Sequence, residues 1–369
     1  MRALFVTVDG GGNLPPALGI AREVERRGGT ARFLGHEIQR STIERAGFRF
    51  DPLRNGRDYD ASAPRGTLRG IRDFAALFAD RGIGDDAIAA ATAEPVDAVV
   101  VDCLLWGALD HTVRAGLPVA SLVHSQWSYF RDLARGPVGA IARVRGVNPV
   151  RAATAAKVIL VTTRRDLEPK PDNTFPDQVR HLGLVWQDRP VEATPNPDRP
   201  RVLVSFSTTH FPGQARAMRR VLDALDGLPI ELVATTGAVD PAQLRIPPGA
   251  RVVRHADHGT LLPTTALVIG HGGHATTARA LAHGIPLLTM PMHPLMDQPA
   301  VARAVTRLGA GRVLSKHARA ATIRAAALTL LADGPHREAA HRLGTETRDH
   351  DGASTAADVL EAQLVHAKD

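Results

Sequence analysis

Short apolar runs alternate along the chain with segments in which apolar residues recur every three or four positions. The first run, RALFVTV at residues 2–8, ends in a glycine-rich turn. A helical pattern follows at residues 16–29, and a second run, TARFLG, occupies residues 30–35. Further apolar runs occur at residues 97–103, 117–123 and 157–163. Continuous apolar runs are typical of strands covered on both faces, so the pattern predicts a parallel α/β sheet.

The pattern breaks at residues 185–201, VWQDRPVEATPNPDRPR, which contain four prolines and no apolar periodicity. Such a segment is typical of a linker. Strand-like runs then resume at residues 201–207, 230–237, 251–255, 266–271 and 286–291. The chain of 369 residues is therefore predicted to form two α/β halves of similar size.

Polar and small residues follow each apolar run of the second half. The five strand ends read SFSTTH (205–210), TTG (235–237), HADH (255–258), HGGHATT (271–277) and MPMHPLMDQ (290–298). Open α/β sheets bind ligands at the carboxyl ends of their strands. HGGHATT also lies immediately before a helical pattern, and backbone N–H groups at a helix start bind phosphate. The second half is therefore predicted to bind a polar ligand that carries a phosphate.

Composition narrows the classes of protein. The chain is 44% hydrophobic and 22% charged, as in ordinary globular proteins. Its one cysteine, Cys103, excludes a disulfide framework within the chain and fits the reducing cytoplasm. Glycine soon interrupts the N-terminal apolar run, so neither a signal peptide nor a membrane span is predicted. The net charge of +7 attracts anions, but the arginines occur as scattered pairs without interleaved aromatic residues. Nucleic acid is therefore not an expected partner.

The segment HGGHATTARALAHGIPLLTMPMHPLMDQP (271–299), with the glycine-rich first turn and the central linker, resembles nucleotide-sugar-dependent glycosyltransferases of the GT-B type. The resemblance is to the family 1-like enzymes that act on macrolides and other natural products, and it covers essentially the whole chain. It implies two Rossmann-like domains that face each other across a cleft. The implied parts are an acceptor domain at 1–187, a linker at 188–200, a donor domain at 201–350 and a C-terminal helix at 351–369 packing back on the first domain.

The resemblance also implies an activity. We expect inverting transfer of a sugar from a dTDP- or UDP-linked donor to a small aromatic or polyketide-like acceptor, giving an O- or C-glycoside. No cofactor and no metal are expected, because the helix start and His271 would neutralise the leaving diphosphate. The one Asp-x-Asp pair, Asp58 and Asp60, is interpreted as part of a surface loop. We expect a cytoplasmic monomer or homodimer.

Carried over onto this sequence, the family's donor site centres on the HGG turn. His271 would hydrogen-bond a donor phosphate, and Gly272 and Gly273 would let the backbone approach the pyrophosphate. The N–H groups of Ala275 and Thr276, with the Thr276 hydroxyl, would hold the β-phosphate. The alternative for His271 is a strand-end histidine bonded to a neighbouring carbonyl group.

Other strand ends supply the remaining implied donor contacts. Asp297 and Gln298 would bind sugar hydroxyls, and a plain helix cap is the alternative for Asp297. The residues expected beside the base, the phosphates or the transferred sugar are His255, His258, Ser207, Thr208 and Gly237. His274 and His283 carry no such role and are predicted to lie on the helix surface.

The first half departs from the family at the acceptor base. Relatives carry a histidine in a G-H-x-x-P turn, which takes the acceptor proton, and an aspartate at a later strand end orients it. Here residues 12–16 read GNLPP, so Asn13 stands in the histidine's place, and an amide accepts no proton at neutral pH. Asp102 is the expected remaining carboxylate, with His124 and Asp9 as weaker candidates for the base. The alternative for Asn13 is a residue chosen to suit the turn.

Aromatic side chains of the first half are candidates for the acceptor pocket. Trp106, Trp127 and Tyr129, together with His124, would wall an apolar pocket, and core packing is the equally supported alternative. Two other functions stay open. One is a membrane-peripheral transferase with a lipid acceptor, which the glycine-rich turn and the basic charge favour. The other is a nucleotide-sugar-binding partner without turnover, which Asn13 favours.

Overall fold

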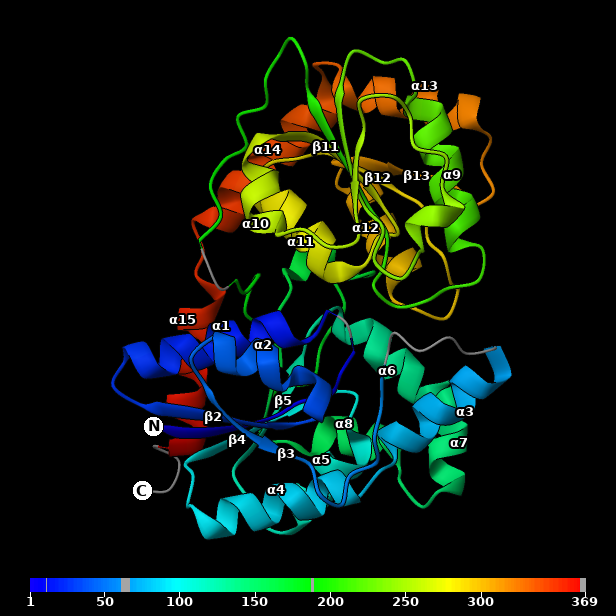
Figure 1. Ribbon diagram of the computed structural model, residues 1–369. Helices are drawn as coiled ribbons and strands as arrows, with labels where there is room; N and C mark the ends of the chain where they lie inside the picture. Colours follow the sequence, from blue (N-terminus) through cyan, green and yellow to red (C-terminus); the bar gives the residue numbers. More distant parts are fainter. Residues whose placement is uncertain (11, 61–66, 187–188, 366–369) are drawn as a thin grey trace. The chain divides into compact units, whose positions relative to one another are not determined.

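The computed structural model describes residues 1–10, 12–60, 67–186 and 189–365. The chain forms two compact units: unit 1 is Met1–Gln187 with Asp351–Asp369, and unit 2 is Asp188–His350. The expected boundary residues 187 and 188, and residues 366–369 of the expected C-terminal helix, lie outside the described residues. Each unit contains a parallel sheet flanked by helices (Figure 1).

The described residues of unit 1 form a sheet of seven parallel strands in the order β3-β2-β1-β4-β5-β6-β7. The strands are β1 Arg2–Val6, β2 Thr30–Gly35, β3 Arg49–Pro52, β4 Ala98–Asp102, β5 Val119–Val123, β6 Val158–Val161 and β7 Val179–His181. The direction in which strands are added reverses between β1 and β4. The loops after these two strands therefore flank a topological switch point, where α/β sheets bind ligands.

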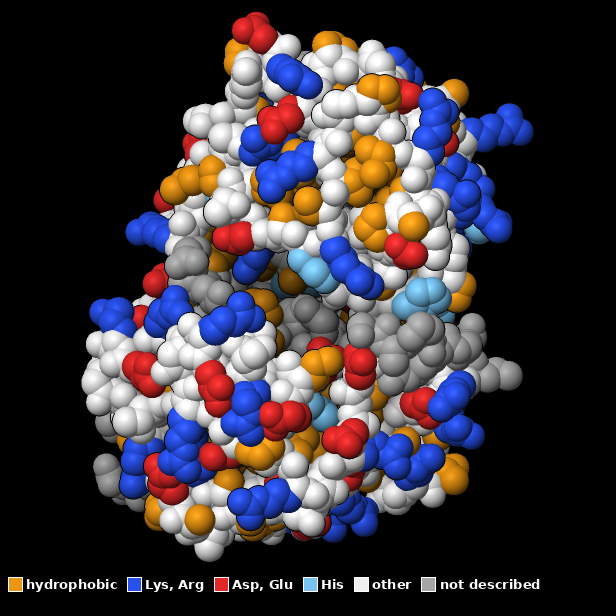
Figure 2. Space-filling model, in the orientation of Figure 1, with side chains coloured by type: hydrophobic (Ala, Val, Ile, Leu, Met, Phe, Trp, Pro, Cys, Tyr) orange, Lys and Arg blue, Asp and Glu red, His pale blue; other side chains and the backbone are white. Residues whose placement is uncertain are grey.

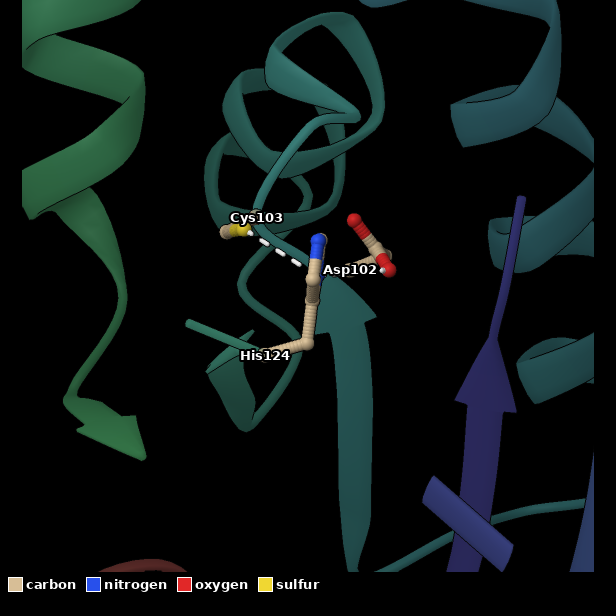
Figure 3. Close-up of side chains that lie close together, drawn as sticks. All are labelled: Asp102, Cys103 and His124. Carbon is tan, nitrogen blue, oxygen red and sulfur yellow. Dashed lines mark hydrogen bonds and ion pairs between the residues drawn. The ribbon is translucent and has the colours of Figure 1, made fainter. Parts of the chain in front are cut away.

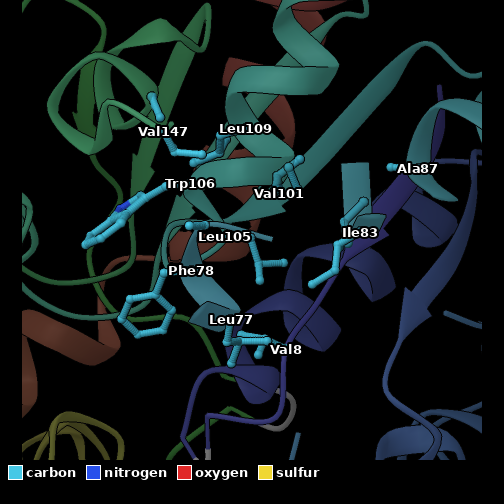
Figure 4. Packing of buried hydrophobic residues seen from close by; sticks show 14 of the residues in the cluster. Val8, Leu77, Phe78, Ile83, Ala87, Val101, Leu105, Trp106, Leu109 and Val147 are labelled. Atoms are coloured by element: carbon cyan, nitrogen blue, oxygen red, sulfur yellow. The ribbon is translucent and has the colours of Figure 1, made fainter. Parts of the chain in front are cut away.

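Successive residues of the central strands of unit 1 point to opposite faces of the sheet, and helices cover each face. Leu4 and Val6 pack in a core with residues of α4 (Gly82–Ala93) and α5 (Trp106–Arg114), whereas Ala3 and Phe5 pack in a second core with residues of α1 (Leu14–Arg26) and α15 (Gly352–Leu360). Figure 4 shows part of the first core, including Ile83 and Ala87 of α4 and Leu109 of α5. The helices of the unit are α1 Leu14–Arg26, α2 Arg40–Arg45, α3 Thr67–Phe78, α4 Gly82–Ala93, α5 Trp106–Arg114, α6 Trp127–Arg135, α7 Pro137–Val144, α8 Pro149–Ala155 and α15 Gly352–Leu360.

Helix α15 follows unit 2 in the chain but packs on α1 of unit 1 (Figure 1). Leu360 of α15 is buried in the same core as Leu18 of α1. Arg27, which follows α1, donates hydrogen bonds to Asp358 at 2.6 Å and to the Ser354 carbonyl at 3.0 Å. Both apolar burial and polar contacts therefore hold the last helix on the first unit.

The described residues of unit 2 form a second parallel sheet, of six strands, in the order β10-β9-β8-β11-β12-β13. Its strands are β8 Arg201–Ser205, β9 Glu231–Thr235, β10 Arg251–Val253, β11 Thr265–Gly270, β12 Leu287–Thr289 and β13 Gly311–Val313. Its helices are α9 Gln214–Leu225, α10 His258–Leu261, α11 His274–Ala282, α12 Gln298–Arg307, α13 Ala320–Leu331 and α14 Pro335–Arg348. The switch point of this sheet lies between β8 and β11.

Residues 189–200 contain no helix or strand, in agreement with the pattern that predicted a linker. They are nevertheless fixed to unit 2. The Ala193 N–H donates to the His283 carbonyl at 2.9 Å, and the Thr194 N–H donates to the Pro263 carbonyl at 2.8 Å. Glu192 pairs with Arg348 at 3.2 Å.

Three short strands, β3, β7 and β13, were not predicted from the sequence. Each lies at an edge of its sheet, and their sequences are RFDP, VRH and GRV. Edge strands pair on one side only and tolerate charged side chains, so they carry no continuous apolar run. The apolar pattern therefore locates the central strands of a sheet better than its edges.

Candidate functional site

The backbones of β8 and β11 approach closely at the switch point of unit 2. A Cβ atom on Gly270, the last residue of β11, would lie 2.5 Å from the carbonyl oxygen of Ser205, the last residue of β8. Only glycine therefore fits before His271. The sequence thus brings the HGG turn directly beside the end of β8.

His271 has an imidazole ring that stays neutral near pH 7. Burial lowers its pKa to about 4, and the nearby Ser205 carbonyl acts in the opposite direction. Its Nδ1 atom is buried and has no well-aligned hydrogen-bond partner among the described residues. The imidazole can therefore donate one N–H to an anion without carrying a charge of its own.

Glycine is required at positions 272 and 273 of the turn for two different structural reasons. Gly272 has a φ of +79°, in the left-handed region that side chains disfavour. A Cβ atom on Gly273 would lie 2.4 Å from His271 Nε2, so glycine here makes room for the ring. The expectation that these residues permit close approach of a pyrophosphate stays a prediction.

Helix α11 begins at His274, within the HGGHATT segment. Gly273 precedes it and supplies no capping side chain. The N–H groups of Ala275 and Thr276 lie in the first turn, where a helix offers no acceptors, and both side chains are half-buried. The positive end of the helix dipole and these N–H groups suit an anion.

The prediction that His274 and His283 lie on the helix surface is wrong. Both are buried, with 8% and 7% of their surface exposed. His274 is the first residue of α11 and one of the buried residues of that helix. His283 follows the helix and contacts the segment that joins the units, because its carbonyl accepts from Ala193 and its ring meets the Val191 backbone.

His258, at the start of α10, lies against the ends of two strands. Its Nε2 is 3.5 Å from Ser205 Oγ and 3.4 Å from Thr235 Oγ1, and Thr235 donates to Ser205 at 3.0 Å. Burial, with a smaller effect of the Arg279 charge, lowers the pKa of His258. Ser205 and Thr235 were not singled out from the sequence, although hydroxyl residues at strand ends were the available signal.

The other predicted residues of this rim differ in exposure. His255 and Thr208 are exposed. Ser207 Oγ accepts from the Thr209 N–H at 3.0 Å, as in a local serine turn. Gly237 has a φ of +56°, and a Cβ atom there would lie 2.6 Å from the Ser207 carbonyl oxygen. Gly237 is thus explained by its backbone conformation and by close packing.

Gln298 holds the loop that precedes it. Its side-chain carbonyl accepts hydrogen bonds from the N–H groups of Met292 at 2.7 Å and His293 at 3.3 Å, and the residue is buried. Its backbone carbonyl oxygen would be 3.3 Å from a Cβ atom on Gly272, so the Asp-Gln pair lies beside the HGG turn. Asp297 precedes α12 and makes no side-chain cap of that helix. A cap therefore does not explain Asp297.

Asn13 and Asp102 meet at the switch point of unit 1. The Asn13 amide nitrogen donates to Asp102 Oδ2 at 2.6 Å and to the Val8 carbonyl at 2.8 Å. Asn13 Oδ1 accepts from the Gly10 N–H at 3.1 Å, and Asp102 Oδ1 accepts from the Leu104 N–H at 2.9 Å. Both side chains are buried, at 2% and 3% exposure. Asn13 thus contacts the carboxylate, but it also organises its own turn.

His124 and Cys103 adjoin the same carboxylate (Figure 3). His124 Nδ1 lies 3.6 Å from Asp102 Oδ2 and 3.7 Å from Cys103 Sγ. Burial and the Asp102 charge raise the pKa of the Cys103 thiol, so the thiol stays protonated at neutral pH. Phe130 packs edge to face on the imidazole at 5.0 Å between ring centroids.

Asp102, Cys103 and His124 are also the group of side chains in the described residues spaced closely enough to hold a metal ion. Hydrogen bonds from Asn13 and Leu104 already engage both carboxylate oxygens. We therefore interpret the group as a hydrogen-bonded cluster. Asp58 and Asp60 lie in an irregular segment, and Tyr59 between them is buried against Phe74.

The predicted acceptor aromatics lie mainly in cores. Trp106 is fully buried and packs edge to face on Phe78, so the core-packing alternative holds and the residue is closed to an acceptor (Figure 4). Trp127 is 2% exposed and packs with Phe130. Tyr129 is half-buried beside Phe130, with 4.9 Å between ring centroids. Tyr129 is thus the most accessible of the three predicted aromatics.

A buried carboxylate that the sequence did not reveal fixes this aromatic helix. Glu168 is fully buried and accepts from the Trp127 N–H at 2.7 Å and the Ser128 N–H at 3.1 Å, at the start of α6. His181 Nε2 lies 3.2 Å from it. Burial alone would raise the pKa of Glu168, but these hydrogen bonds outweigh burial and the pKa is lowered. Glu168 therefore acts as a charged cap for α6.

Comparison with known proteins is consistent with this geometry. Residues 219–361 match the family model described as the C-terminal domain of erythromycin biosynthesis protein CIII-like proteins. The chain is 28% identical to 4'-demethylrebeccamycin synthase of Lentzea aerocolonigenes over 98% of this chain and 99% of that protein. It is 35% identical to aklavinone 7-beta-L-rhodosaminyltransferase of Streptomyces galilaeus, over 45% of this chain and 38% of that protein.

A solved structure shows the same fold. The crystal structure of the glycosyltransferase VinC in complex with dTDP aligns with a TM-score of 0.75 at 19% identity, covering 99% of this chain and 100% of that chain. The chain has the GT-B fold, and its similarity to named glycosyltransferases shows that it is an enzyme that transfers sugars. The fold class predicted for this glycosyltransferase is confirmed, and an enzyme that transfers sugars is favoured over a binding partner without turnover.

None of the described helices of the glycosyltransferase is both long and apolar enough to cross a membrane. On the face visible in Figure 2, Lys and Arg side chains are interspersed with Asp and Glu. This surface agrees with the scattered arginine pairs of the sequence.

Proposed function

We propose that this glycosyltransferase moves a sugar from a dTDP- or UDP-linked donor to a small aromatic or polyketide-like acceptor, with inversion and without a metal ion. Two of the similar proteins support the substrate classes. One is by name a rhodosaminyltransferase acting on aklavinone, and the other was crystallised with dTDP.

The observation that carries the donor assignment is the arrangement of His271 before α11. A neutral imidazole and the uncapped helix start lie at the same switch point, with the N–H groups of Ala275 and Thr276 in the first turn. These donors and the helix dipole offset the negative charge that develops on a departing diphosphate. The site therefore supplies the role that a divalent cation would otherwise fill.

The acceptor assignment rests on Asn13. An amide takes no proton, and the two oxygens of Asp102 already accept hydrogen bonds from Asn13 and Leu104. Acceptors that lose a proton easily are therefore favoured, such as phenols, imides or ring carbons next to a phenol. Their acidity offsets part of the general-base assistance that a histidine in the turn would give, typically about 10²- to 10⁴-fold.

Inversion follows from a single displacement at the anomeric carbon. A retaining enzyme of the double-displacement type needs a carboxylate that attacks this carbon. Asp102 is only 3% exposed and both of its oxygens are engaged, which makes it a poor nucleophile. Direct attack by the acceptor on the face opposite the diphosphate is the simpler course.

A turnover screen tests the proposal. The protein is incubated with dTDP- and UDP-sugars and a panel of phenols and polyketide aglycones, and products are followed by mass and by the NMR coupling of the anomeric proton. We expect a glycoside of inverted anomeric configuration with stoichiometric release of nucleoside diphosphate. A product with retained configuration would contradict the single displacement, and no product from any pair would contradict the substrate classes.

A further inference from the structure

Three neighbouring strand ends meet at the switch point of unit 1. Asn13 follows β1, Asp102 ends β4 and His124 follows β5, and β1, β4 and β5 are adjacent in the sheet. Asp102 Oδ2 lies 2.6 Å from the Asn13 amide nitrogen and 3.6 Å from His124 Nδ1. An imidazole and a carboxylate therefore face each other here, although the turn that usually carries the histidine carries an amide.

We propose that His124 is the catalytic residue that takes the acceptor proton, and that Asp102 is the positioning residue behind it. This inference rests on the proposed glycosyl transfer. It moves the proton-accepting group from the loop after β1 to the loop after β5, two strands along the sheet, while the carboxylate at the end of β4 serves both positions.

The orientation of the ring supports this role. Nδ1 faces Asp102 Oδ2 and Cys103 Sγ, so an N–H on Nδ1 points toward the carboxylate (Figure 3). The proton-accepting lone pair then belongs to Nε2, which no described residue engages in a hydrogen bond. This is the tautomer that an imidazole general base requires, with its other nitrogen directed at an acid group.

Exposure separates His124 from the neighbouring candidates. Its side chain is 14% exposed, whereas that of Asp102 is 3% exposed and hydrogen-bonded at both oxygens. Cys103 is buried and keeps its proton. The ring contacts Phe130, and the half-buried Tyr129 also packs on Phe130. An aromatic acceptor beside His124 would therefore meet aromatic side chains.

The interaction between His124 and Asp102 is weaker than a direct hydrogen bond. The separation of 3.6 Å between His124 Nδ1 and Asp102 Oδ2 exceeds hydrogen-bond length, and Asn13 and Leu104 share the carboxylate charge. Such contacts often shorten only when substrate is bound. A weakly supported imidazole takes protons from phenols far more readily than from aliphatic alcohols, which agrees with the acidic acceptors proposed above.

The acceptor oxygen forms a bond to the anomeric carbon while the bond from that carbon to the diphosphate oxygen breaks. The electron pair of the broken bond leaves on the nucleoside diphosphate. The acceptor proton passes to His124 Nε2, and the resulting imidazolium is stabilised by Asp102 until the proton is released to water.

The test compares His124→Gln with wild type and with His111→Gln. His111 is a matched control, since it lies in the same unit, pairs with Asp85 at 3.4 Å and has a side chain that is 36% exposed. Turnover is measured against pH with a phenol of ordinary acidity and with a nitrophenol, which is already ionised near neutral pH. Thermal unfolding and dTDP affinity are measured on each protein.

We expect His124→Gln to lower kcat for the ordinary phenol by about 10²- to 10⁴-fold and to abolish an ionisation that does not move with the acceptor. The loss should be much smaller for the nitrophenol, and His111→Gln should behave as wild type. Equal rates for His124→Gln and wild type would overturn the proposal. So would a loss that is the same for both acceptors, because that pattern indicates a structural role.

Failure of the proposed function gives a different pattern. Wild type would then transfer no sugar to either acceptor, whatever His124 does. If His124→Gln does not fold, the pH profile of the wild type still shows whether a group of the enzyme takes the acceptor proton. An ionisation that is common to both acceptors supports an enzyme base, and a profile that moves entirely with the acceptor refutes it.

Discussion

The Asn13 amide nitrogen lies 2.6 Å from Asp102 Oδ2, so the turn after β1 places an amide directly beside the carboxylate. The contact links the loop after β1 to the end of β4, across the switch point of the sheet. It uses a lone pair of Asp102 without creating a group that takes a proton. Acceptor chemistry is therefore the property most directly affected by this residue.

Asn13→His should extend the enzyme toward simple alcohols. The new imidazole would stand beside Asp102, which can orient it, and should recover part of the roughly 10²- to 10⁴-fold assistance that a general base gives. The measurement is kcat/KM for an aliphatic alcohol before and after the change. Asn13→Gln is the matched control, since it keeps an amide. No gain for the histidine variant, with dTDP affinity and thermal stability retained, would count against the assignment.

His271→Ala should weaken binding of dTDP and UDP by about 1.5 to 3 kcal/mol, the range for a lost hydrogen bond to a charged group. Calorimetric titration measures the change, with His317→Ala as the control because His317 is exposed and follows Lys316 on a loop. The fold should survive. Unchanged affinity in His271→Ala would remove the phosphate role of His271.

Stability should respond to acid through His271. Its pKa is about 4 in the folded protein and near 6.5 when unfolded, so the unfolded chain binds the proton more tightly. The stabilisation is complete above about pH 6.5 and is lost as the pH falls toward 4, by about 3 kcal/mol in all. Urea unfolding of wild type and His271→Ala at pH 7 and pH 4 measures this. Wild type should lose more stability than the variant, and equal losses would contradict the burial of the ring.

Activity should persist in a chelator. The start of α11 and His271 would offset the charge of the leaving diphosphate, so no divalent cation is needed. Initial rates are compared in EDTA and in excess Mg²⁺ or Mn²⁺. If EDTA abolishes turnover and a cation restores it, the metal-independent mechanism is wrong and the acidic pair Asp58 and Asp60 becomes the first place to look.

The sequence predicted the central strands well because they are buried on both faces. Runs such as AVVVD and TALVIG carry that burial in their composition. The edge strands β3, β7 and β13 were not predicted, because each pairs with a neighbouring strand on one side only. Their charged residues resemble those of a loop. The local apolar pattern thus predicted the strands that are buried on both faces.

Residues of the site were predictable only where a motif carried them. The HGG turn and the proximity of Asn13 to Asp102 followed from motif positions, and their roles stay predictions. Glu168 gave no signal, because its partners Trp127 and Ser128 lie 41 and 40 positions away in the chain. His283 was wrongly predicted to be exposed, since a segment distant in sequence covers it. Trp106 was a candidate for the acceptor pocket, but its side chain is fully buried in a hydrophobic core.

The most direct test of this account is the rate ratio for one acceptor pair of matched shape. A phenolic acceptor and its saturated cyclohexanol counterpart are compared at equal donor concentration, with wild-type protein and the best dTDP- or UDP-sugar. We expect kcat/KM for the phenol to exceed that for the alcohol by at least about 100-fold, the lower end of the assistance that a histidine in the turn would give. Similar rates for the two acceptors would show that this enzyme activates ordinary alcohols fully, and would contradict the argument from Asn13.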